Sequence, residues 1–150
     1  MRLVPVLAAL LALLALLALA APAAAQQGVR TPPPGSPERA AILDGVRAVV
    51  QKQLRQPVRF RVDHLRVRGG WAFLQATPQR PDGRPLDYRG TPYGEAKEAG
   101  AFDDQATVLL RREGAAWRVV AFNLGATDVV WESWPAEFGA PREIFPSWGG

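Results

Sequence analysis

Residues 36–55, with the sequence SPERAAILDGVRAVVQKQLR, decide the fold because they predict one long amphipathic helix. Ser36 is a typical N-cap, since its hydroxyl accepts a hydrogen bond from an otherwise unpaired amide. Pro37 suits the first helical position, where its missing N–H would have no partner. Pro57 disfavours helical geometry at the residue before it and ends the pattern. We therefore expect a helix from Pro37 to Arg55.

The apolar residues of this helix recur at steps of three and four, which places them on one face. A helix with a single apolar face must bury that face against another element. The helix is therefore expected to form one layer of a packed domain. The apolar residues are Ile42, Leu43, Val46, Val49, Val50 and Leu54.

After the helix, the apolar pattern changes to the period of two that is typical of a half-buried strand. Val58, Phe60 and Val62 alternate with polar residues, and the phase slips at His64, as a β-bulge would cause. Gly69-Gly70 predicts a hairpin turn because both residues accept positive φ. Further strands are expected over residues 71–77, 106–111 and 117–124.

The segments outside these strands differ in character. Residues 79–100 form a long excursion with a turn at Pro81-Asp82-Gly83 and one short helix at Tyr93–Glu98, and such loops are often functional. The C-terminal tail from Thr127 is too rich in apolar residues to be a free tail. We expect it to fold back over the core, with a helical turn near Asp128–Trp134.

These elements predict one α+β domain over residues 37–150, with an N-terminal helix packed on a four-stranded antiparallel sheet. Residues 109–120, LLRREGAAWRVV, are similar to the closing hairpin of NTF2-like domains, and the layout resembles cystatin-like and NTF2-like folds. Residues 125–131, GATDVVW, and the following Trp134-Pro135 resemble uncharacterised exported proteins of proteobacteria. The resemblance implies a roll in which a curved sheet wraps the helix, and it transfers no catalytic residue.

The first 25 residues have the three parts of a secretory signal peptide. Arg2 precedes an apolar run over residues 3–20, and Pro22 and three alanines follow. We expect cleavage near Ala25-Gln26, which places the mature protein in the periplasm or outside the cell without a stable membrane anchor. The alternative is a retained anchor, since 18 apolar residues approach the shortest membrane-spanning helix. Residues 26–36, QQGVRTPPPGS, predict an extended and poorly packed linker, or a tail without a role.

Composition excludes several classes of function. The 150 residues contain no Cys, which removes disulfides, thiol catalysis and thiolate metal sites. The net charge of +4 is mild for an exported chain, so we expect no nucleic-acid partner. The sequence also lacks phosphate-binding, dinucleotide-binding and zinc-protease motifs. We expect no cofactor and no metal, and the oligomeric state stays open.

The candidate binding residues are two arginines and two tryptophans. Arg59 and Arg61 share one face of the first strand and predict either a solvated face or a strip that binds an anionic glycan or an acidic envelope protein. Trp131 and Trp134 lie near the end of the chain and suit a ligand groove or a protein contact. Trp71 and Trp117 each follow a hairpin turn and are expected in the core.

The candidate catalytic residues are weaker. His64 beside Asp63 suits a general base only if the bulge turns both side chains to the same side. Asp103 and Asp104 open the third strand and either cap it or join His64 in a pocket. The same acid pair is too small a ligand set for calcium.

Three functions follow from these residues. The first is a non-catalytic exported domain that binds a protein or envelope component through its sheet face, the loop from Gln79 to Gly100 and the C-terminal aromatics. The second is an NTF2-like pocket enzyme that uses His64 with Asp103 or Asp104. The third is a structural subunit of an envelope complex, which an exposed apolar patch at Trp131 and Trp134 would favour.

Cleavage of the predicted signal peptide is directly testable. We expect the protein recovered from cells to begin near Gln26, because processing needs small side chains before the cut. Intact-mass measurement and N-terminal sequencing give the answer, and Ala25→Leu should block processing. A wild-type chain that begins at Met1 would favour the retained anchor instead.

Overall fold

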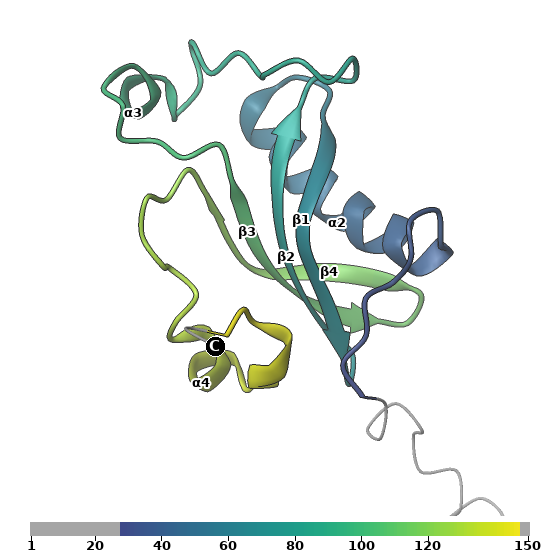
Figure 1. The fold of residues 1–150 in the computed structure, drawn as a ribbon. Helices are drawn as coiled ribbons and strands as arrows, with labels where there is room; N and C mark the ends of the chain where they lie inside the picture. The colour runs from purple at the N-terminus through teal and green to yellow at the C-terminus, as the bar shows by residue number, and fades with distance from the viewer. Residues whose placement is uncertain (1–27, 148–150) are drawn as a thin grey trace, which may run out of the picture.

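The computed structural model describes residues 28–147, and it shows one helix packed on a four-stranded antiparallel open sheet (Figure 1). The strands lie in the sheet in their sequence order. The expected signal peptide and its cleavage site lie outside the described residues. The main elements are α2 (Pro37–Leu54), β1 (Arg59–Arg68), β2 (Trp71–Gln79), β3 (Ala106–Glu113) and β4 (Ala116–Leu124). Short helices lie at α3 (Gly94–Glu98), α4 (Trp134–Phe138) and the 3-10 turn η2 (Arg142–Ile144).

The ends of α2 follow the sequence signals closely. The Ser36 hydroxyl accepts a hydrogen bond from the Arg39 amide at 3.3 Å, which confirms the N-cap. The helix ends at Leu54, one residue before the expected end, because Arg55 has a left-handed backbone with φ of 54°. None of the helices within residues 28–147 has the length and apolar character needed to cross a membrane.

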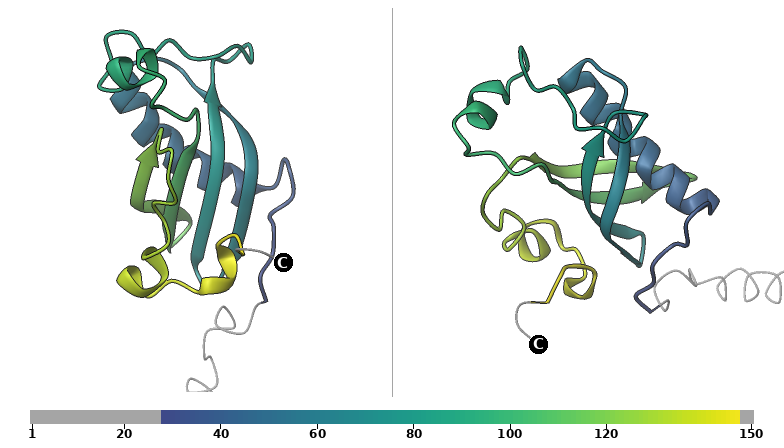
Figure 2. Two further views of the ribbon diagram at one scale, coloured as in Figure 1. Left: turned by 60° about the vertical axis from the view of Figure 1, so that its left-hand side comes forward. Right: turned by 45° about the horizontal axis from the view of Figure 1, so that its top comes forward.

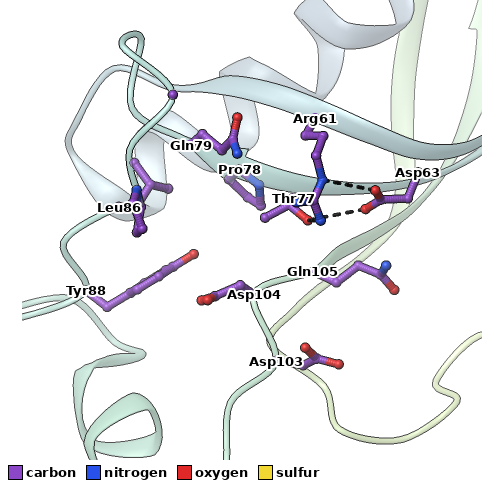
Figure 3. A pocket seen from close by; sticks show the side chains of 12 residues that line it. Arg61, Asp63, Thr77, Pro78, Gln79, Leu86, Tyr88, Asp103, Asp104 and Gln105 are labelled. Atoms are coloured by element: carbon purple, nitrogen blue, oxygen red, sulfur yellow. Dashed lines mark hydrogen bonds and ion pairs between the residues drawn. The ribbon is translucent and has the colours of Figure 1, made fainter.

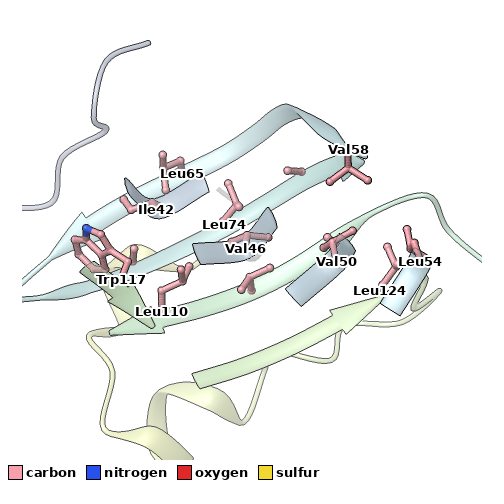
Figure 4. Close-up of a cluster of buried hydrophobic side chains, with 14 of the residues drawn as sticks. Ile42, Val46, Val50, Leu54, Val58, Leu65, Leu74, Leu110, Trp117 and Leu124 are labelled. Atoms are coloured by element: carbon pink, nitrogen blue, oxygen red, sulfur yellow. The ribbon is translucent and has the colours of Figure 1, made fainter. Parts of the chain in front are cut away.

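The apolar face of α2 forms the main hydrophobic core with one face of the sheet (Figure 4). Its buried positions are four residues apart, so they form one row along the helix: Ile42, Val46, Val50 and Leu54. Trp117 of β4 and Leu74 of β2 pack against this row from the sheet. Burial of each such side chain stabilises the fold by about 1.5–3 kcal/mol.

The β-bulge expected at His64 is confirmed. Val62 pairs with Ala76 and His64 pairs with Gln75, so Asp63 is an extra residue in β1. Regular alternation would place Asp63 and His64 on opposite faces of the sheet. The bulge instead directs both side chains away from α2, because Asp63 contacts Thr77 and the His64 ring packs on Phe73, as described below.

The C-terminal tail covers part of the opposite face of the sheet (Figure 2). A second hydrophobic cluster joins Phe73 and Leu109 of the sheet to tail residues such as Ile144 and Phe145. The folding back of the tail is therefore confirmed. Its helical turn is α4, which begins at Trp134 rather than near Asp128, since Pro135 occupies an N-terminal helical position.

Two expectations about strand ends were wrong. β2 does not end at residue 77, as expected, but continues through Pro78 to Gln79 opposite β1. The pairing of β2 with β3 ends at Ala76, so Pro78 lies where β2 needs hydrogen bonds on only one side. The third strand also continues past Arg111 to Glu113.

The segment before α2 is extended as expected, and it is packed against the domain at two of its residues. Arg30 forms an antiparallel bridge with Val67, with hydrogen bonds of 3.0 and 2.8 Å between their backbones. Pro32 is fully buried. The Arg30 guanidinium also pairs with Glu38 in the first turn of α2. These contacts hold the segment against the edge of the sheet.

Gly45 sets the close approach of α2 to β4, and its replacement tests that contact. A Cβ atom at Gly45 would lie 2.4 Å from the Trp117 carbonyl oxygen. Alanine favours a helix by about 1 kcal/mol over glycine, yet overpacking against backbone costs about 1–3 kcal/mol. We expect Gly45→Ala to lower the free energy of unfolding by about 1 kcal/mol, as measured by urea unfolding.

Ala48→Gly is the matched control, because Ala48 lies on the exposed side of the same helix. This variant should lower the free energy of unfolding by about 0.5–1 kcal/mol, through the lower helix propensity of glycine alone. A stabilised Gly45→Ala protein would contradict the close contact.

Candidate functional site

The tail leaves one end of the sheet face uncovered, and a pocket of about 430 Å³ lies there (Figure 3). We call it the Tyr88 pocket. The sheet, the loop after β2 and the segment before β3 form its walls. Its polar and charged lining side chains are Arg61, Asp63, Thr77, Gln79, Tyr88, Asp103, Asp104 and Gln105.

Arg61 and Asp63 neutralise one another on the sheet side of the pocket. Arg61 Nε lies 3.2 Å from an oxygen of Asp63, and its Nη2 donates to the Thr77 hydroxyl at 3.0 Å. The same hydroxyl donates to the other Asp63 oxygen at 3.2 Å, which closes the network. Arg61 and Asp63 lie two residues apart in β1, so strand alternation places both side chains on this face of the sheet.

The expected basic strip of Arg59 and Arg61 is therefore divided. Arg61 lines the pocket in an ion pair, whereas Arg59 lies outside the lining and donates two long hydrogen bonds of 3.4 Å to the Gln79 side chain. The Arg59 guanidinium also lies beside Gly83, where a Cβ atom would approach it to 2.8 Å. Both side chains are exposed, and anion binding by the pair stays a prediction.

Asp103 and Asp104 form the opposite wall, on a segment that Gly125 fastens to the end of β4. The Asp103 amide donates to the Gly125 carbonyl at 3.0 Å, and the Gly125 amide donates to the Gln105 carbonyl at 3.0 Å. Gly125 needs its positive φ of 88°, and a Cβ atom there would lie 2.0 Å from the Phe102 ring. This fastening fixes where both carboxylates meet the pocket.

The two carboxylates of that wall differ in their partners. Lys97 of α3 lies 2.7 Å from both oxygens of Asp104. The Asp103 side chain is exposed and has no hydrogen bond or ion pair with any side chain of residues 28–147. Asp103 is therefore the carboxylate of the pocket that no cation within the described part of the chain pairs with.

Tyr88 is the most unusual residue of the pocket, and sequence reasoning did not identify it. It is only 4% exposed, and its hydroxyl is a buried polar atom without a hydrogen-bond partner in the described protein. Figure 3 shows the phenol oxygen pointing toward the space bounded by Thr77, Pro78 and Asp104. Burial and the nearby Asp104 charge raise the pKa of Tyr88, so the phenol stays neutral.

The packing of the Tyr88 ring fixes the direction of its hydroxyl. The ring lies 4.7 Å from the Phe102 ring, and the Lys97 ammonium lies 5.7 Å from the Tyr88 ring centroid. The only sequence signal for Tyr88 was its place in the long excursion after β2, which was expected to be functional.

His64 does not join the acid pair. Its Nε2 donates to the Ile144 carbonyl at 2.9 Å, and its ring packs edge-on against Phe73 at 5.6 Å. It lines a separate surface hollow beside the tail, together with Arg66 and Arg142. The expected combination of His64 with Asp103 or Asp104 was therefore wrong, because the bulge turns His64 toward the tail.

Trp131 and Trp134 are buried: only 9% and 8% of their surfaces, respectively, are exposed to solvent. Both pack edge-on against Phe73, and Trp131 also stacks on Phe145. Their large apolar rings cover the sheet, which corrects the expectation of an exposed aromatic contact surface. Trp71 and Trp117 are buried as expected, on opposite faces of the sheet.

The chemistry of the Tyr88 pocket is that of polar recognition. Carboxylates accept hydrogen bonds, side-chain amides donate and accept them, and a neutral phenol does both. Within residues 28–147 no group of three or more His, Cys, Asp or Glu side chains is placed to hold a metal ion.

Comparisons with known proteins identify no relative of this chain. No protein-family model matches the chain, and neither a curated protein nor a solved structure shows significant similarity to it.

The burial of His64 predicts a pH dependence of stability. Desolvation, and secondarily the charge of Arg66, lower the pKa of His64 below its usual value of 6.5, although the Ile144 bond opposes this shift. The unfolded chain then binds the proton more readily, so stability should fall as the pH decreases below about 6.5. Urea unfolding between about pH 5 and 7, followed by tryptophan fluorescence, measures this slope.

His64→Gln keeps a hydrogen-bond donor but cannot titrate, so it should flatten the slope. Asp87 and Glu38, whose pKa values are lowered by Arg89 and Arg30 respectively, lose stabilising interactions only at more acidic pH. An unchanged slope in the variant would assign the pH dependence to other groups.

Proposed function

We propose that this chain is an exported, non-catalytic binding domain that takes a polar group of an envelope component into the Tyr88 pocket. The component is a glycan or a side chain of an envelope protein. The observation that carries the proposal is the Tyr88 hydroxyl, which is buried, directed into the pocket and unpaired within the described protein. An unpaired buried hydroxyl costs about 1–3 kcal/mol, and a ligand that bonds to it recovers part of that cost.

The division of the sheet face supports the same site. The tail covers the apolar part of the face with aromatic rings, and the part that stays open is lined by charged and amide side chains. A pocket of this volume lies within the usual range for small-molecule sites, about 300–1,000 Å³. The excursion over residues 79–100, which is unusually long for a compact domain, contributes one wall of the pocket.

Export and the fold family belong to this proposal as well. The leader-like composition of residues 1–25 supports export to the periplasm or the medium. One long helix against an antiparallel sheet supports a cystatin-like or NTF2-like roll. The role of a structural subunit loses its support, because Trp131 and Trp134 are committed to the core.

A pocket-filling variant tests the proposed function. We expect solubilised envelope material to shift the amide NMR signals of pocket residues such as Thr77 and Asp103, with the bound component recovered unchanged in mass. Gln105→Trp should abolish these shifts, because an indole would occupy the pocket.

Glu132→Trp is the matched control, since Glu132 is exposed on the tail away from the pocket lining. It should leave the shifts intact. Shifts confined to the tail, or shifts that survive Gln105→Trp, would contradict a ligand in the Tyr88 pocket. A chemically altered component would contradict the non-catalytic role.

A further inference from the structure

We infer that the ligand of the Tyr88 pocket is a hydroxylated amine, an amino sugar in its chemical class, with Asp103 as its counter-charge. This inference rests on the proposed function and adds to it the charge and hydrogen-bonding character of the ligand. It stands on three features of the pocket: its charge balance, its unused hydrogen-bonding groups and its apolar wall.

The charge balance of the pocket is negative. Three carboxylates line it against a single guanidinium. Arg61 is paired with Asp63, and Asp104 is paired with Lys97, which leaves the charge of Asp103 uncompensated. An uncompensated carboxylate at the rim of a concave site attracts a cation and disfavours an anion. An anionic glycan therefore suits this pocket less well than a ligand with an ammonium group.

The unused hydrogen-bonding groups suit hydroxyl groups on the same ligand. The Tyr88 hydroxyl has no hydrogen-bond partner among residues 28–147, and a neutral phenol both donates and accepts. Gln79 and Gln105, which line the pocket, use their side-chain oxygens as acceptors for Arg59 and Gln75, so their NH₂ groups remain as possible donors. A simple metal cation would use none of these donors, whereas sugar hydroxyls pair with donors and acceptors alike.

The remaining wall is apolar. Pro78, Pro85 and Leu86 line the pocket next to the Tyr88 ring. The C–H groups of a sugar ring pack against such a surface, and a small linear polyamine would leave most of it uncovered. The combination of apolar wall, amide donors and one uncompensated carboxylate is therefore more specific than a general acidic patch.

Three pyranoses of similar size and different charge test the inference on the purified chain. They are glucosamine, glucose and glucuronate, added at about pH 6.5, where an amine is mostly protonated. We expect glucosamine to bind most tightly and glucuronate about tenfold more weakly, as measured by amide shifts of pocket residues in NMR titrations. N-acetylglucosamine, which keeps the ring but loses the charge, should bind like glucose.

Two variants assign the roles of single residues. Asp103→Asn should weaken glucosamine about tenfold and leave glucose unchanged, because it removes only the counter-charge. Asp128→Asn is its control, since it removes the same charge from an exposed residue outside the pocket lining. Tyr88→Phe should weaken all the sugars while the protein keeps or gains stability, because the variant removes a buried unpaired hydroxyl. A hydroxyl with a structural role would instead lower the stability.

The outcomes separate this inference from the proposed function. Glucosamine, glucose and glucuronate could instead bind with equal affinity, and Gln105→Trp could abolish the binding of all three. That result would keep the pocket as the binding site and overturn the charge preference. Tightest binding of glucuronate would overturn the inference outright. Binding of none of the sugars, while envelope material still shifts the pocket signals, would reject the amino sugar and keep the proposed function.

Discussion

The contact between the apolar row of α2 and one face of the sheet determines the rest of this structure. It buries the strand residues that alternation directs to that side, and it leaves the opposite face of the sheet to be covered by other means. The chain has no second long helix among its described residues, so the C-terminal tail supplies the cover with tryptophan and phenylalanine rings. The tail is short and covers only part of the face. The Tyr88 pocket lies in the part that stays open.

The bulge at Asp63 brings His64 to the open face of the sheet. Asp63 shares this face with Arg61 by regular alternation, and it pairs there with Arg61 and Thr77. Without the extra residue, His64 would point to the opposite side, into the apolar core under α2. With it, the His64 ring reaches the Ile144 carbonyl. One local irregularity therefore supplies a hydrogen bond that holds the tail.

The pocket also illustrates how a binding site can oppose stability. The Tyr88 hydroxyl is buried without a partner in the described part of the chain, although a hydrogen bond within the protein would stabilise the fold. Gly125 and Lys97 hold the surrounding wall in place through backbone bonds and an ion pair with Asp104. These interactions around the pocket stabilise the fold, and the polar groups that line the pocket remain available for hydrogen bonds with a ligand.

The sequence by itself determined the elements, because their signals are local: the Ser36 cap, the row of apolar residues in α2, the glycine turns and the phase slip at His64. It also indicated that the apolar tail folds back. Only the tertiary structure decided which side chains meet. Tyr88, Asp63 and Asp104 come from three separate segments, and no spacing along the chain records that they share one pocket. The burial of Trp131 and Trp134, and the separation of His64 from the acid pair, were likewise decided by how the tail packs on Phe73, a contact between residues about 60 positions apart in the sequence.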